Sequence, residues 1–166
     1  MNKKIVTLTG FMGCGKTHVS KILAEELGFD VIDSDKEIEK VKKKTIPQIM
    51  AEVGEFGFRR IESEVIKDIL DGFFIVLSAG GGAILKNSEI LLEKSTVVFL
   101  DTDFEVCYQR IKNDLNRPLI QGKTKAQIAQ MYVNRYDVYK NNCHFSVRCD
   151  DAFETVKKIK DFLQNS

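Results

Sequence analysis

One motif constrains the fold of this chain more than any other feature of the sequence. Residues 10–17, GFMGCGKT, fit the pattern G-x-x-x-x-G-K-S/T. Glycines let such a loop wrap so that successive backbone N–H groups converge on a phosphate, and the following helix adds partial positive charge. In this pattern Lys16 reaches the β- and γ-phosphate oxygens, and the Thr17 hydroxyl binds Mg²⁺. The motif predicts a nucleotide-phosphate site, provided that a strand precedes it and a helix follows.

The neighbouring residues have the required pattern. Residues 5–9 are a short β-branched run that predicts a strand, and apolar residues recur at helical spacing over residues 16–27. Gly28 is well placed to end this helix, and residues 29–33 predict a second strand. We therefore interpret residues 10–17 as a phosphate-binding loop rather than as a glycine-rich turn without a ligand.

The rest of the chain alternates between helices and strands. Residues 73–77 are continuously apolar, as expected for a central parallel strand buried on both faces, and residues 96–100 and 144–149 predict two more strands. Five strands alternating with helices predict an α/β fold of three layers, in which helices flank a five-stranded parallel sheet on both sides. We expect a single domain over residues 1–166, because domains usually have about 100 to 200 residues.

Capping and helix-breaking residues predict the helix boundaries. The helical region from about residue 36 to residue 71 should break near Pro47 and around Gly54. The helices that follow are expected to start at the caps Asn87, Thr102 with Glu105, Thr124 with Gln127, and Asp151 with Glu154. The last helix has one apolar face, which includes Phe153. Residues 112–124 form a polar loop of about twelve residues, a length at which loops are often lids.

Composition excludes several classes of partner. The 25 basic and 24 acidic side chains leave a net charge of +1, whereas proteins that bind duplex nucleic acid usually carry a basic excess. No apolar run of about 18 residues and no secretory signal is visible, so we expect no membrane association. The four cysteines form no CxxC pair, which argues against a zinc-binding cluster. We expect them to be free thiols, which fits a reducing cytoplasm. We expect a cytoplasmic protein and, by default, a monomer.

Several polar residues should gather at the carboxyl edge of the sheet, where open α/β sheets bind ligands. Asp33 and Asp35 follow the second strand, and two carboxylates at this spacing can divide between them the binding of a metal's water shell and of a substrate hydroxyl. Alternatively, Asp33 is only the N-cap of the next helix. Gly80, Gly81 and Gly82 end the third strand at the same edge, where a turn or a ligand against the backbone would require glycine.

Two isolated arginines, Arg59 and Arg135, lie on separate predicted helices. Each could be an exposed helix charge, or together they could clamp a planar carboxylate with forked hydrogen bonds. Within the phosphate loop, we interpret Cys14 as a small residue tolerated in a tight turn rather than as a nucleophile. We interpret His18 as a surface or packing residue rather than as a catalyst.

The ordered set of motifs resembles that of the shikimate kinases. The set comprises residues 10–17, 33–35, 58–62 and 80–82, Arg110 followed by residues 117–119, and Arg135 preceding Tyr139. The resemblance runs from residue 5 to about residue 149, and it implies a fold like that of the nucleoside monophosphate kinases. It also implies a substrate-binding segment over about residues 34–62 and a mobile lid around Arg117. The implied reaction is phosphorylation of the 3-hydroxyl of shikimate by ATP, in the route to chorismate and the aromatic amino acids.

The resemblance, carried over position by position, implies roles for the acceptor site. Asp35 would hold the ring hydroxyls. It is the candidate for accepting the hydroxyl proton, and the alternative is that it only orients the hydroxyl. Arg59, Arg135 and the backbone of residues 80–82 would bind the carboxylate and the ring. Glu62 would orient Arg59 through an ion pair.

The resemblance also implies roles around the nucleotide. The residues expected to bind ATP are Gly13, Cys14, Gly15, Lys16, Thr17, His18, Arg110 and Arg117. Lys16 and Arg117 would neutralise the transferring phosphoryl group, and Thr17 would hold Mg²⁺ together with Asp33, which would act through water. These roles agree with the chemistry, because phosphoryl transfer depends mainly on positioning and on charge stabilisation.

Some features depart from the family pattern or leave alternatives open. Residues 97–101 match the usual Walker B pattern, so spacing alone would place Asp101 on the metal, whereas the resemblance favours Asp33. Residues 148–152 are poor in the arginine and proline that the family often has where it packs the adenine. The rival functions are a gluconate or nucleoside monophosphate kinase of the same fold, and a nucleotide-binding switch without an acceptor site.

Overall fold

The computed structural model describes residues 4–166 and contains one parallel sheet of five strands. Their bounds are Ile5–Thr9 (β1), Asp30–Asp33 (β2), Ile75–Ser78 (β3), Thr96–Asp101 (β4) and Phe145–Arg148 (β5). The strands lie in the order β2-β3-β1-β4-β5, and every neighbouring pair is parallel. All carboxyl ends therefore lie at one edge of the sheet, and the loop after the central strand β1 is at the middle of this edge.

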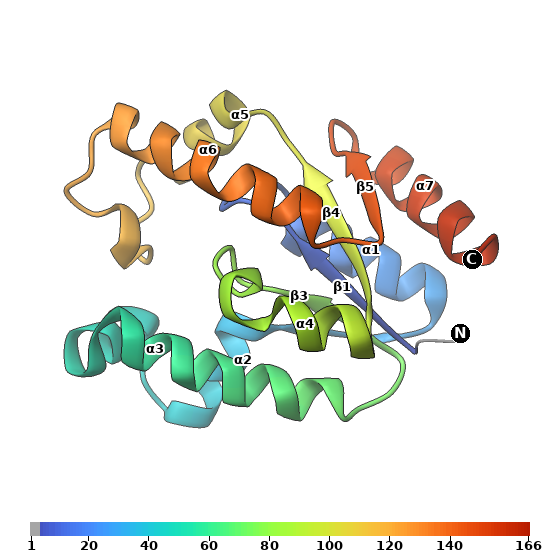
Figure 1. Cartoon of the computed structure of the whole chain (residues 1–166), viewed down its shortest axis with the longest axis horizontal. Helices are drawn as coiled ribbons and strands as arrows, with labels where there is room; N and C mark the ends of the chain where they lie inside the picture. Colours follow the sequence, from blue (N-terminus) through green and yellow to red (C-terminus); the bar gives the residue numbers. More distant parts are fainter. Residues whose placement is uncertain (1–3) are drawn as a thin grey trace.

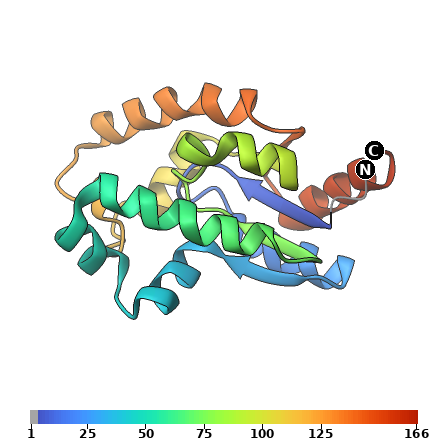
Figure 2. The same cartoon turned by 60° about the horizontal axis from the view of Figure 1, so that its bottom comes forward.

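Helices cover both faces of the sheet, which confirms the three predicted layers (Figure 1). On one face α1 (Lys16–Leu27) packs against α7 (Ala152–Gln164). On the other face α4 (Ile84–Lys94) lies between α3 (Ile46–Leu70) and α6 (Lys125–Asn141), as Figure 2 shows from a second direction. The shorter elements are α2 (Ser34–Lys42), α5 (Phe104–Ile111) and the 3₁₀ turn η1 (Pro118–Ile120). Within residues 4–166, none of these helices combines the length and the apolar composition that crossing a membrane requires.

Most element boundaries follow local signals in the sequence. The first strand and the first helix have the predicted bounds, and α1 ends at Gly28, whose φ of 69° is the left-handed conformation common at helix ends. Thr124 accepts a hydrogen bond from the backbone N–H of Gln127 at the start of α6, and Asp151 caps α7 in a similar way. The predicted breaks are also present, because α2 and α3 are separate and α3 kinks at Gly54.

Two predicted caps are wrong. Asn87 lies inside α4, which begins at Ile84, and its side-chain amide donates to the carbonyl oxygen of Ala83 (2.8 Å). Thr102 does not cap α5, because its hydroxyl donates to the carbonyl oxygen of Cys14 (2.9 Å) and so ties the end of β4 to the phosphate loop. In both cases the polar side chain has a backbone partner other than the one that its spacing suggested.

Three aromatic residues from predicted apolar segments, two in the predicted buried strand and one on the apolar face of the last helix, are exposed. Phe73 and Phe74 precede β3, which begins only at Ile75, and the Lys4 ammonium lies over their rings at 5.4 and 5.0 Å from the centroids. Phe153 of α7 is 69% exposed and borders a cavity. The continuously apolar run at residues 73–77 therefore supplies a buried strand only in its second part.

Candidate active site

The phosphate loop joins β1 to α1 and depends on glycine at its tightest point. Gly13 has a φ of 79°, and a Cβ atom there would lie 2.8 Å from the carbonyl oxygen of Cys107. Both the backbone conformation and the contact with α5 therefore exclude a side chain. Because α1 begins at Lys16, immediately after Gly15, the free N–H groups of its first turn are available at the loop.

Two cations are held at this loop by its own carbonyl groups. The Lys16 ammonium donates to the carbonyl oxygens of Gly10 (2.6 Å) and Phe11 (3.1 Å). Arg110, in the last turn of α5, donates through Nη1 to the carbonyl oxygen of Gly13 (2.8 Å). The loop thus combines backbone donors with fixed positive charge, which is the arrangement that binds phosphates.

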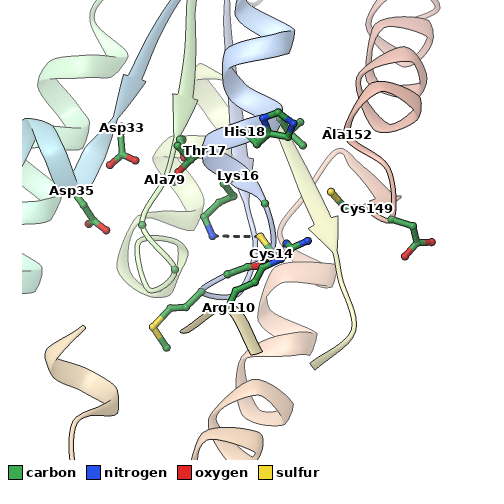
Figure 3. Close-up of a pocket in the computed structure, with 18 of the residues that line it drawn as sticks. Cys14, Lys16, Thr17, His18, Asp33, Asp35, Ala79, Arg110, Cys149 and Ala152 are labelled. Carbon is green, nitrogen blue, oxygen red and sulfur yellow. Dashed lines mark hydrogen bonds between the residues drawn. The ribbon is translucent and has the colours of Figure 1, made fainter. Parts of the chain in front are cut away.

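A cavity of about 560 Å³ lies over the loop (Figure 3). Its lining includes the residues predicted to bind ATP and Mg²⁺, namely Gly13, Cys14, Gly15, Lys16, Thr17, His18, Asp33, Arg110 and Arg117. In the close-up, Asp33 and Asp35 lie on one side of Lys16, and Cys149 and Ala152 lie on the other. The cavity therefore has an acidic end and a second end formed by the segment between β5 and α7. Cys14 is buried in the loop, whereas His18 is exposed on α1.

The acidic end follows from the register of the sheet. Asp33, the last residue of β2, pairs with Ser78 of β3, so the segments after these two strands come together. Asp33 Oδ1 accepts the backbone N–H of Lys36 (3.1 Å), so this residue is both the N-cap of α2 and part of the cavity. Sequence reasoning missed Ser34, whose buried hydroxyl accepts the N–H of Gly80 (2.8 Å) and joins the two segments.

Asp35 has the electrostatic environment of a proton acceptor. Burial raises the pKa of its carboxyl group above the ordinary value, and the negative charge of Asp33 raises it further. The positive charges of Lys16, Arg117 and Arg59 partly offset both effects. A carboxylate with a raised pKa is a stronger base than a free aspartate, and the cations around it would stabilise charge during a reaction.

A second, smaller hollow of about 70 Å³ adjoins the first. The residues that line both are Met12, Asp35, Gly80, Gly81 and Arg117. Met12, to which no sequence motif assigns a role, packs against Gly81 at this junction. A ligand in the second hollow and a phosphate on the loop would therefore meet beside Asp35 and Arg117.

An ion pair holds Arg59 in the second hollow. Arg59 Nη1 lies 2.8 Å from Glu62 Oε1, and the two residues are only 8% and 1% exposed. A Cβ atom at Gly82 would overlap the Arg59 guanidinium, so the absence of a side chain lets the cation lie directly against the backbone. Arg59 is thus not an exposed helix charge, and the expected pair with Glu62 is present.

Arg135 reaches the same hollow from α6 and is 8% exposed. Among the described residues, the buried side-chain atoms without a hydrogen-bond partner are Arg135 Nη1 and Glu62 Oε2. Leaving a buried donor unpaired costs free energy, so such a group indicates a place for a ligand. An anion in this hollow would supply the partner that Arg135 lacks.

The segment over residues 112–124 borders both hollows. Arg117 lines both of them, and its Nε donates to Asp114 Oδ2 (2.9 Å). Pro118 and Leu119 line only the second hollow, and Figure 1 shows the segment opposite the first turns of α3. The predicted lid residue therefore lies at the junction of the hollows, while the mobility of this segment stays a prediction.

Asp101, the carboxylate favoured by Walker B spacing, lines neither hollow. The phenol of Tyr136 donates to Asp101 Oδ2 (2.7 Å), so this carboxylate links β4 to α6. Between the two candidate metal ligands, only Asp33 lies in the cavity with Thr17.

Comparison with known proteins agrees with this geometry. A shikimate kinase family model matches residues 12–164. A shikimate kinase of Persephonella marina is 41% identical over 157 residues, which cover 93% of this chain and 95% of that protein. The solved structure of shikimate kinase from Acinetobacter baumannii in complex with shikimate is 36% identical, with a TM-score of 0.93, and the match covers 99% of this chain and 94% of that one. Because the family model matches nearly the whole chain, this protein belongs to the shikimate kinase family.

Proposed function

We propose that this protein transfers the γ-phosphoryl group of ATP to the 3-hydroxyl group of shikimate, giving shikimate 3-phosphate and ADP. The observation that carries the proposal is the junction of two hollows, one over the phosphate loop and one containing a pair of buried arginines. The relative from Acinetobacter baumannii binds shikimate in its solved structure, which supports the same acceptor here.

The nucleotide would bind in the larger cavity. Its β- and γ-phosphates would lie on the backbone N–H groups of residues 13–17, and Lys16 would exchange its loop carbonyls for phosphate oxygens. Arg110 lies beside this path. The adenosine would extend toward residues 149–153, which form the other end of the cavity.

The residues at the acidic end fit a bound Mg²⁺. Thr17 offers a hydroxyl oxygen and Asp33 a carboxylate, and Mg²⁺ is usually held by one or two such protein groups, substrate phosphates and water. Since Asp33 Oδ1 caps α2, Oδ2 is the oxygen that would face a water molecule of the metal. When bound, Mg²⁺ neutralises charge on the β- and γ-phosphate oxygens.

The acceptor would bind in the smaller hollow, with its carboxylate between Arg59 and Arg135. Asp35 would then bind the 3-hydroxyl and accept its proton as the oxygen attacks the γ-phosphorus and the bond to ADP breaks. Lys16 and Arg117 would neutralise the charge on the transferring group, which is the main requirement of this transition state. Closure of residues 112–124 would exclude water, which otherwise competes as acceptor.

The direct test is an assay of ADP release with shikimate, gluconate and AMP offered separately. We expect turnover with shikimate far above the rate with the other two compounds, because the solved relative from Acinetobacter baumannii, which matches 99% of this chain, binds shikimate. Turnover with gluconate or AMP, but not with shikimate, would support another kinase of this fold. Release of ADP without any acceptor dependence would support a nucleotide-hydrolysing switch.

Arg135→Ala should raise the KM for shikimate roughly 10- to 100-fold, the value of one charge-assisted hydrogen bond, while the KM for ATP changes little. Steady-state kinetics beside Arg60→Ala, which removes an exposed arginine from α3, provide the measurement and its control. An unchanged shikimate KM would remove Arg135 from the acceptor site.

Asp33→Asn should raise the Mg²⁺ concentration needed for half-maximal rate roughly 10- to 100-fold, as is typical for groups that hold a metal through water. Asp101→Asn should change it much less, because Asp101 lies outside the cavity and is bound by Tyr136. A titration of rate against Mg²⁺ measures this concentration for both variants. A larger increase in Asp101→Asn than in Asp33→Asn would assign the metal to Asp101 instead.

We further propose that the protein acts in the cytoplasm. All four cysteines, at positions 14, 107, 143 and 149, are free thiols in the described structure, which suits a reducing compartment. Fractionation of cells followed by detection of the protein would test this. Size-exclusion chromatography would test the expected monomer.

A further inference from the structure

The loop after β3, residues 80–82, contacts residues from two other segments of the site. We call these residues the glycine loop. A Cβ atom at Gly80 would lie 2.7 Å from Asp35 Oδ1, and one at Gly82 would overlap the Arg59 guanidinium. The loop backbone is thus in direct contact with residues proposed to bind the hydroxyl and the carboxylate. Three consecutive glycines have unusual conformational freedom, so this alignment needs a restraint from outside the loop.

Tyr139 of α6 supplies such a restraint. Its phenol donates a hydrogen bond to the carbonyl oxygen of Gly81. The residue is 2% exposed, and its ring stacks on Phe99 of β4 at 5.4 Å between centroids and 23° between planes. Burial raises the pKa of Tyr139 above its ordinary value, so the phenol keeps the proton that it donates.

The hydrogen bond to Gly81 determines where the next N–H group points. No peptide bond in the described chain is cis, and in a trans peptide the carbonyl of one residue and the N–H of the next point in opposite directions. Because the Gly81 carbonyl points toward the Tyr139 hydroxyl, the Gly82 N–H points away from that hydroxyl. Gly82 lines the second hollow beside Arg59, which makes this N–H a candidate donor to an anion held there.

The same face of α6 also carries Arg135, four residues before Tyr139. The charge of Arg135 and its hydrogen bond to the phenol partly offset the effect of burial on the pKa of Tyr139. Both side chains are buried, and both reach toward the second hollow or its wall. One rigid helix therefore holds a cation and, through Gly81, a backbone donor.

We propose that Tyr139 is a positioning residue that aligns the Gly81–Gly82 peptide with Arg135 for binding of the shikimate carboxylate. This role rests on the proposed function, since shikimate is the ligand concerned. Tyr139 itself touches no substrate. It acts through the glycine loop and through its contact with Arg135, so its loss should weaken acceptor binding while the phosphate loop and Asp35 remain in place.

The matched experiment compares Tyr139→Phe with Tyr136→Phe. Each removes one phenol hydroxyl from α6, but Tyr136 donates to Asp101 outside both hollows. Tyr139→Phe should raise the KM for shikimate roughly threefold to tenfold, the range for one hydrogen bond, with the KM for ATP and kcat within about twofold. Tyr136→Phe should leave the shikimate KM unchanged. If Tyr139 had only a structural role, Tyr139→Phe would lower the amount of active enzyme but would not raise the KM for shikimate above its wild-type value while the KM for ATP stays constant.

A second measurement uses the wild-type chain and does not depend on the folding of a variant. In ¹H–¹⁵N spectra, shikimate should shift the Gly82 amide signal strongly, whereas the amide of Gly28, at the end of α1, should not move. Two results would refute the role of Tyr139 and leave the proposed function standing. One is an unmoved Gly82 signal in wild-type enzyme that phosphorylates shikimate. The other is a shikimate KM of Tyr139→Phe equal to that of Tyr136→Phe. If wild-type enzyme leaves shikimate unphosphorylated, both fall.

Discussion

Asp35→Asn should lower kcat with shikimate by roughly two to four orders of magnitude, the usual contribution of a positioned general base. The amide keeps the size of the side chain and can still contact a hydroxyl, so the KM for shikimate should change much less than kcat. The same substitution should raise the Tm, because it removes a charge that burial and the neighbouring Asp33 both disfavour. A less active but more stable variant distinguishes this account from simple damage to the fold.

The pH dependence of that stability gain has a definite sign. The pKa of Asp35 is raised in the folded protein, so its ionisation stabilises the unfolded state more than the folded state. Wild type and Asp35→Asn should therefore have similar Tm values below the ordinary aspartate pKa of about 3.9. The difference should grow as pH rises through the raised pKa of Asp35. Thermal melts across this range, with the exposed Asp30→Asn as control, measure it.

A lower Tm for Asp35→Asn at neutral pH would contradict the electrostatic account of this residue. A kcat within about threefold of wild type would contradict its role as proton acceptor, since general-base catalysis is worth far more. In that case Asp35 would only orient the hydroxyl, and the charges of Lys16 and Arg117 would carry the catalysis.

Arg59→Ala should lower the free energy of unfolding by about 3–5 kcal/mol at neutral pH, which is typical when one partner of a buried ion pair is removed. Glu62, at 1% exposure, would be left buried without its cation. Burial already raises the pKa of Glu62, and Arg59 lowers it in part, so loss of Arg59 would raise it further. The loss of stability should therefore shrink as pH falls and Glu62 takes up a proton.

The double variant Arg59→Ala/Glu62→Gln tests this explanation by denaturant unfolding. Removing the charge of Glu62 should recover a large part of the stability that Arg59→Ala loses, while shikimate binding should remain weak because the acceptor site still lacks its arginine. The exposed neighbour Arg60→Ala should change the free energy of unfolding by no more than about 0.5 kcal/mol. Equal instability of the single and double variants would show that the pair with Glu62 is not the cause.

Local sequence patterns predicted the parts of this protein that depend on near neighbours in the chain. The phosphate loop, the cap at Gly28 and the capping box at Thr124 each need residues only a few positions apart. The predicted caps at Asn87 and Thr102 failed because their side chains bind other backbone groups, one of them in the phosphate loop.

The finer structure of the site depends on contacts between distant segments. Ser34 binds Gly80 across 46 positions, and Tyr139 binds Gly81 across 58. No periodicity or spacing reports such pairs, because they arise from the order of strands in the sheet. The motif positions of Arg59, Asp35 and the glycines could be predicted from the family resemblance, but their mutual contacts could not.

A crystal structure of the protein with shikimate and ADP is the most direct test of the central claim, that an acid and a nucleotide bind side by side at the edge of the sheet. The account predicts the shikimate carboxylate between Arg59 and Arg135, with its 3-hydroxyl beside Asp35 and facing the phosphate loop. Shikimate bound with its carboxylate toward Lys16, or outside the second hollow altogether, would contradict it.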